Sequence, residues 1–128
     1  MHTKLSAAAL AALVLFPLAA HTQQDGRDPW EQALAAYEIG DYRDAVSWLS
    51  VAGENNDVRA QQMLGMMYVY GEQLYGTAVP QDIGLGQAWL YRAEAQGSDV
   101  ARFMLVRLDR GQPIPSTLAI ANKQASGE

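Results

Sequence analysis

An internal repeat constrains the fold of this chain more than any other feature of its sequence. When the chain is aligned with itself so that position 41 falls on position 82, identical residues coincide at apolar or helix-capping places. The seven coinciding pairs are Asp41 with Asp82, Trp48 with Trp89, Leu49 with Leu90, Ala52 with Ala93, Ala60 with Ala101, Met63 with Met104, and Leu64 with Leu105. We call this shift the repeat offset. A fixed offset of this kind indicates an architecture built from repeated supersecondary units.

The residues between these landmarks predict helices. Asp28, Asp41, Asp57 and Ser98 can cap helix starts, and glycines or polar clusters mark the stops. No segment alternates with period two over enough residues to predict a strand. We expect helices over residues 29–39, 41 to about 53, 57–70, 82 or 85 to 96, and 98–110, a loop over residues 72–81, and a short last helix over residues 117–124.

These elements predict an all-α fold in which antiparallel helix pairs repeat and stack into a short right-handed α-solenoid. Stacking is required because a single helix pair cannot cover its own apolar face. Trp48, Trp89, Tyr37 and Tyr68 recur at matching places, so we interpret them as aromatic side chains that fill the gaps between pairs. Met63 and Met104 are open to two interpretations, as core between repeats or as part of a binding face.

Residues 1–20 have the order of a secretory signal peptide. Lys4 precedes an apolar run over residues 5–16, and Pro17 and the small residues Ala19 and Ala20 follow it. This run is too short to span a hydrocarbon core of about 30 Å, which disfavours an uncleaved anchor. We therefore expect a signal peptide at 1–20, a flexible mature N-terminus at 21–27, the helical repeat domain at 28–112, and a capping helix with the C-terminal tail at 113–128. The predicted location is periplasmic or secreted, with no stable membrane span after cleavage.

The repeat also has a recognisable residue pattern. It reads Ala60-x-x-x-Leu64-Gly65-x-x-Tyr68-x-x-Gly71, then Val79-Pro80-Gln81-Asp82, then Ala88-Trp89-x-x-x-Ala93-x-x-x-Gly97. This pattern resembles the Sel-like repeat, a relative of the tetratricopeptide repeat, over residues 29–110. The chain departs from the family pattern in its long turn at 72–81, in Gly86 where alanine is expected, and in Asp109 where a third tyrosine would stand. The resemblance implies a bacterial protein whose first helix in each pair lines a concave binding face.

The composition argues against several functions. The formal net charge of −5 is unfavourable for non-specific binding of nucleic acid, and the absence of cysteine rules out disulfides and thiol catalysis. Beyond the predicted signal peptide the only histidine is His21, which could bind copper together with a free α-amine, but no second histidine completes such a site. No nucleophile, phosphate-loop or zinc-protease motif is present. We therefore expect neither enzymatic activity nor a cofactor or metal.

Binding is the remaining activity, and the resemblance places it on the third and fifth helices. The long turn is a second candidate, because loops on rigid scaffolds often carry recognition, but it can equally be a tolerated insertion. Methionine adapts to partner surfaces, and tyrosine and arginine are frequent anchors of interfaces. The predicted partner is another envelope protein or a peptide. The alternatives are a binder of envelope polysaccharide or peptidoglycan and, third, an enzyme acting on cell-wall substrates. The candidate partner-binding residues are Arg59, Met66, Tyr70, Tyr75 and Arg107.

Overall fold

The computed structural model describes residues 26–114, and every regular element in that part of the chain is helical. This confirms the predicted all-α class. The expected signal peptide and the expected last helix at residues 117–124 lie outside the described residues. The elements in chain order are α1 (Pro29–Glu38), α2 (Tyr42–Glu54), α3 (Val58–Tyr70), α4 (Glu72–Tyr75), a 3-10 turn (Gly76–Ala78), α5 (Ile83–Ala95) and α6 (Asp99–Asp109).

The helix starts lie where the capping residues predicted them. The carboxylates of Asp28, Asp41, Asp57 and Asp82 accept hydrogen bonds from backbone amides in the first turns of α1, α2, α3 and α5, and the Ser98 hydroxyl does the same for α6. Each cap satisfies an amide that the helix itself cannot pair. As a result the starts of α2 and α5 are separated by the repeat offset, and so are the starts of α3 and α6.

Three pairs of consecutive helices are joined by a short turn whose last residue caps the second helix. At the end of α5, Gly97 adopts a φ of 91°, and the amide of Ser98 donates to the carbonyl of Ala93 at 3.1 Å. Ser98 then caps α6, so the turn between the two helices is short. The same turn joins α1 to α2 and α2 to α3. Tight turns of this kind make consecutive helices antiparallel neighbours.

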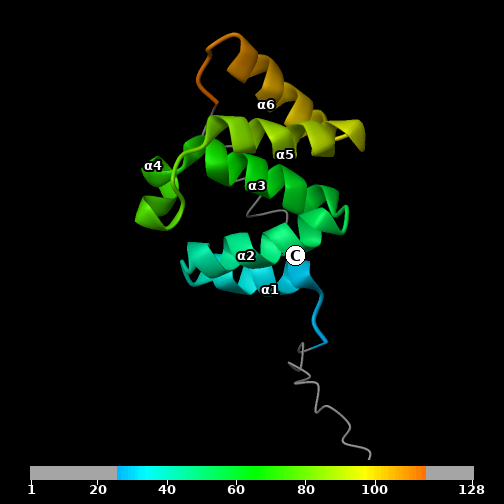
Figure 1. Cartoon of the computed structure of the whole chain (residues 1–128), viewed down its shortest axis with the longest axis vertical. Coiled ribbons are helices and arrows are strands. Elements are labelled where there is room, and N and C mark those ends of the chain that lie inside the picture. Colours follow the sequence, from blue (N-terminus) through cyan, green and yellow to red (C-terminus); the bar gives the residue numbers. More distant parts are fainter. Residues whose placement is uncertain (1–25, 115–128) are drawn as a thin grey trace, which may run out of the picture.

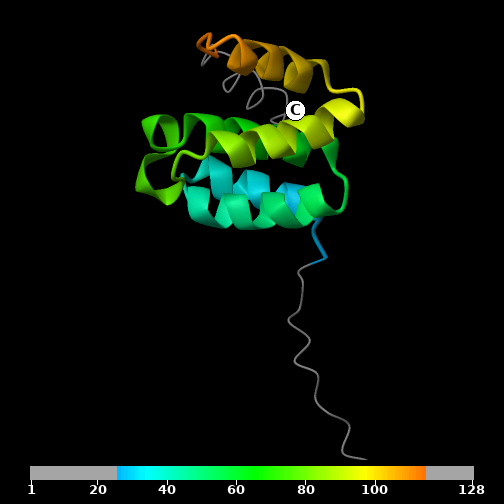
Figure 2. The same cartoon turned by 45° about the horizontal axis from the view of Figure 1, so that its top comes forward.

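The helices stack in layers, with α1 beside α2 at one end and α6 at the other (Figures 1 and 2). Helix α3 lies centrally, because it packs against α2, α5 and, less extensively, α6. The largest side chains with less than 2% exposure come from several layers: Leu49, Leu64, Met66, Met67, Leu90, Met104, Gln61 and Val79. No helix within residues 26–114 is long and apolar enough to cross a membrane.

The one buried polar side chain among the described residues, Gln61, joins three helices. Its amide nitrogen donates to the carbonyl of Gly53 at 2.9 Å, and its side-chain oxygen accepts from Gln96 at 2.7 Å. The Gln61 side chain is therefore hydrogen-bonded both to the last turn of α2 and to the residue that follows α5. Because these bonds satisfy Gln61 within the fold, we regard it as a structural residue rather than a site.

The predicted aromatic core is only partly as expected. Trp89 is 8% exposed and belongs to the core, whereas Trp48, Tyr37 and Tyr68 are half-buried and pack against its edge. Trp89 packs its ring against Gly53 of α2, while Trp48 lies in the first layer and borders a surface hollow. Met63 and Met104 are 4% and 0% exposed, which confirms the core interpretation for both.

The prediction of a loop without helix at residues 72–81 is wrong. It contains α4 and the 3-10 turn, and its base is closed because Gly71 lies against the backbone of Gln81. The side-chain amide nitrogen of Gln81 donates to the carbonyl of Val69 at 2.8 Å, and the backbone amide of Asp82 donates to the carbonyl of Tyr68 at 2.9 Å. The segment is therefore an ordered excursion that returns to the end of α3.

Candidate peptide-binding face

Three of the five candidate binding residues are buried. Met66, Tyr70 and Tyr75 are 1%, 8% and 5% exposed, so they belong to the core and do not form an open binding surface. For Met66 and Tyr70 the physical reason is the position of α3. Neighbouring helices cover it on several sides, so nearly every residue from Ala60 to Gly71 is buried, and α3 has no free face of the kind that a helix at the edge of a bundle would have.

Tyr70 nevertheless donates a hydrogen bond to a segment outside the helices. Its hydroxyl donates to the backbone carbonyl of Ile114 at 2.9 Å, across 44 positions of the sequence. A tyrosine keeps its proton at neutral pH, and burial raises the pKa of Tyr70 further above its usual value of 10.0. Tyr70 is therefore a fixed donor toward a segment that lies outside the helices.

Arg107 holds the neighbouring residue of the same segment. Its Nε donates to the carbonyl of Pro113 at 2.7 Å, and its guanidinium lies 5.4 Å from the centre of the Phe103 ring. Tyr70 on α3 and Arg107 on α6 thus hold two consecutive main-chain carbonyls. We call Tyr70, Arg107 and the surface between them the carbonyl clamp.

The residues in the clamp, Pro113 and Ile114, were not among the sequence-based candidates. In the sequence the two prolines at 113 and 115 disfavour a helix there but indicate no contact with α3 or α6. Ile114 is half-buried and packs against the core. A signal was present in the order Gly111-Gln112-Pro113, because glycine followed closely by proline marks a helix end after which the chain continues extended.

Tyr75 has a structural role on α4, just beyond the end of α3. Its ring contacts Tyr42 and Tyr37 edge-on, with ring centres 5.0 and 6.0 Å apart, and the Tyr37 hydroxyl donates to the Tyr75 hydroxyl at 3.5 Å. Figure 1 shows α4 next to the start of α2, where Tyr42 lies and this cluster forms. Burial, followed by the hydrogen bond with Tyr37, raises the pKa of Tyr75 far above its usual value. The tyrosine cluster fastens the 72–81 excursion to α1 and α2.

Arg59 is exposed, but its guanidinium is already paired within the fold. It lies 2.5 Å from Asp57 and 3.9 Å from Asp28, and it stacks 4.6 Å from the centre of the Trp30 ring. Burial raises the pKa of Asp57, but hydrogen bonds from Arg59 and from the amides of Ala60 and Arg59 outweigh it, so the net pKa is lowered. Arg59 therefore links the start of α1 to the start of α3.

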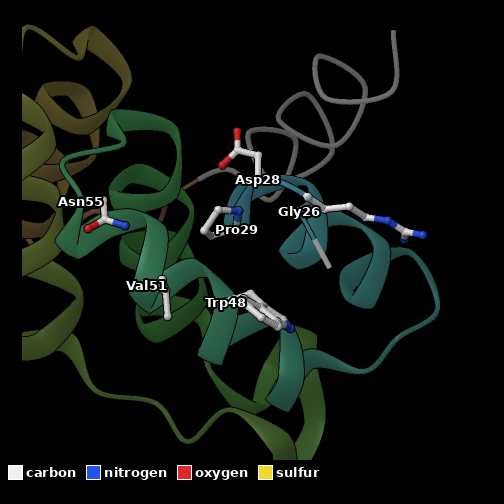
Figure 3. A pocket seen from close by; sticks show the side chains of 7 residues that line it. Gly26, Asp28, Pro29, Trp48, Val51 and Asn55 are labelled. Carbon is white, nitrogen blue, oxygen red and sulfur yellow. The ribbon is translucent and has the colours of Figure 1, made fainter. Parts of the chain in front are cut away.

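A hollow of about 500 Å³ lies outside the first helix pair, lined by residues 26–29, Trp48, Val51 and Asn55. Figure 3 shows Trp48 and Val51 on α2, with Pro29 on the facing side and the carboxylate of Asp28 turned away from Trp48. An aromatic wall with polar groups at the rim is a composition that suits a small ligand.

In the part of the chain that the structure describes, no group of three or more histidine, aspartate or glutamate side chains could hold a metal ion. Comparisons with protein-family models, with curated proteins and with solved structures find no match to this chain.

Proposed function

We propose that this chain is an exported Sel-like repeat protein of the bacterial cell envelope that binds a protein or peptide partner without acting on it chemically. The helix pairs, related by the repeat offset, would form a short right-handed α-solenoid. The partner would lie as an extended segment across α3 and α6.

The observation that carries this proposal is the carbonyl clamp. Tyr70 and Arg107 donate to main-chain carbonyls at 2.9 and 2.7 Å, and main-chain carbonyls are present in every protein segment. Recognition through the main chain supplies affinity, while neighbouring apolar contacts select the side chains of the ligand. The other two buried candidates, Met66 and Tyr75, would support this face from within the core rather than touch the partner.

The experiment is site-specific cross-linking in the native host. A photoreactive residue in place of Phe103, an exposed residue on α6 whose ring lies 5.4 Å from the Arg107 guanidinium, should capture an envelope protein. Excess unlabelled chain should compete for the capture, while its Arg107→Ala variant should compete poorly. The matched control is the same photoreactive residue at Asp44, an exposed position on α2. Equal capture from both positions would contradict a site on α3 and α6.

The hollow beside Trp48 supports a second candidate, binding of an envelope saccharide. Trp48 offers a half-buried indole, and Asn55 and Arg27 lie at the same hollow. In this case a soluble peptidoglycan fragment should bind to the native chain and lose affinity in Trp48→Ala. The control Leu74→Ala, which changes an exposed side chain on α4, should bind as the native chain does.

A further inference from the structure

The segment in the carbonyl clamp reaches it through the turn that ends α6. Gly111 has a φ of 60°, its amide donates to the carbonyl of Leu108 at 3.0 Å, and the Gln112 amide donates to the carbonyl of Arg107 at 2.8 Å. The same pair of hydrogen bonds ends α1, α2 and α5, where the next residue caps another helix. Here the equivalent residue is Gln112, which caps no helix among the described residues. Pro113 follows it, so this turn directs a non-helical segment toward α3.

The sequence of this segment makes it extended. Gln112 precedes Pro113 and Ile114 precedes Pro115, and a residue before proline is restricted to extended backbone. Proline also fixes its own φ and carries no amide, so Pro113 has no donor that the fold must satisfy. The segment therefore loses little conformational freedom when it docks, as is typical of proline-rich ligands.

Three contacts hold the segment: two hydrogen bonds to its main chain and one packing contact with a side chain. The bonds from Arg107 and Tyr70 go to the carbonyls of Pro113 and Ile114 and are independent of the side chains. The third contact is the packing of the Ile114 side chain against the core. The face thus selects an apolar residue and holds the main chain at that residue and at the one before it.

We infer that residues 112–114 occupy the partner's place, so that the partner presents an extended segment with an apolar residue flanked by prolines and must displace them. This inference rests on the proposed function. A covalently attached segment competes at an effective concentration of order millimolar. The partner's apparent affinity is therefore its intrinsic affinity multiplied by the fraction of chains in which the face is free.

The experiment uses the full chain and a fluorescent peptide with the sequence of residues 111–116. Ile114→Glu should release the attached segment and bind the added peptide at least about tenfold more tightly than the native chain. The matched control Ile39→Glu makes the same change at a residue that is 81% exposed, and it should bind as the native chain does. Ile114→Ala, a milder truncation of a half-buried side chain, should shift affinity in the same direction by a smaller factor. Adding Tyr70→Phe to Ile114→Glu should weaken binding roughly fivefold, because one hydrogen bond is lost.

The outcomes separate this inference from the proposed function. Equal peptide affinity in the native chain and both Ile114 variants would overturn the inference. So would a native dimer that Ile114→Glu converts to a monomer, because the segment would then belong to a neighbouring copy. If the proline-flanked peptide fails but a different extended peptide binds in a manner that requires Arg107, the inference falls and the proposed function stands. If no peptide binds any variant, both fall.

Discussion

The backbones of Gly65 and Gly86 lie against each other where α3 crosses α5. A Cβ on Gly86 would stand 2.9 Å from the carbonyl oxygen of Gly65 and 2.8 Å from Cγ2 of Val69. A Cβ on Gly65 would stand 3.2 Å from the carbonyl oxygen of Gly86 and 2.5 Å from Cγ of Leu90. Gly86 is therefore required by the close approach of these two helices.

Gly86→Ala should destabilise the chain by about 1–3 kcal/mol, because the added methyl group forces the helices apart. Gly84→Ala is the matched control on the same helix, since its Cβ would meet only the Asp82 carboxylate at an ordinary 3.6 Å. This second change should be neutral or stabilise by up to about 1 kcal/mol, because alanine favours helix more than glycine does. Urea unfolding of both variants makes the comparison, and equal midpoints would contradict the crossing geometry.

Trp89→Ala and Trp48→Ala should differ in stability although the two residues are repeat-equivalent. Trp89 is buried against α2, so its truncation should cost about 3–5 kcal/mol. Trp48 is half-buried beside the hollow, and its truncation should cost roughly 1–2 kcal/mol. Urea midpoints of the two variants test this order, and a larger loss for Trp48 would show that the hollow is filled in solution.

The tyrosine cluster should make stability fall in alkaline solution. The folded pKa of Tyr75 is raised above its usual value of 10.0, so its contribution is complete below pH 10 and is lost as the pH rises toward the folded pKa. Above pH 10 the unfolded chain releases this proton and the folded chain keeps it. Tyr75→Phe should therefore lose less stability than the native chain between pH 8 and about 11 in urea titrations. Tyr91→Phe, at a residue that is 58% exposed, should follow the native pH profile, and a parallel decline in all three proteins would argue against the cluster.

Asp57 should contribute stability that acid removes. Its folded pKa is below the usual 3.8, so its contribution is present above that pH and is lost as the pH falls through the folded pKa. Asp57→Ala should cost about 0.5–2 kcal/mol at neutral pH through loss of the helix cap, and it should flatten the acid decline below pH 4. Asp99→Ala changes a carboxylate that is 88% exposed and does not cap α6, so it should cost at most a few tenths of a kcal/mol. Thermal melts between pH 7 and 3 compare the two variants.

Export is testable without the structure. If residues 1–20 are a cleaved signal peptide, the protein recovered from the periplasm or medium of its host should begin at His21 or within a few residues of it. Intact-mass measurement determines the N-terminus. Retention of Met1 in a cytoplasmic fraction would contradict the proposed location.

Local residue patterns were sufficient to locate the helices. Asp28, Asp57 and Ser98 cap helices in the structure as the sequence predicted, and α1, α3 and α5 end near the expected glycines. These features are predictable because a cap involves only a side chain and amides two or three residues away. The repeat offset likewise appears in the starts of α2 and α5 because identical signals recur along the chain.

Burial and contacts between distant residues required the tertiary structure. Met66 and Tyr75 resembled surface anchors in the sequence, but α3 is covered by its neighbours and Tyr75 lies among tyrosines of other helices. The clamp on Ile114 depends on Tyr70, which is 44 positions away, and no local pattern encodes such a pair. Sequence periodicity reports which residues share one face of a helix, whereas the number of covered faces is decided only when the helices pack together.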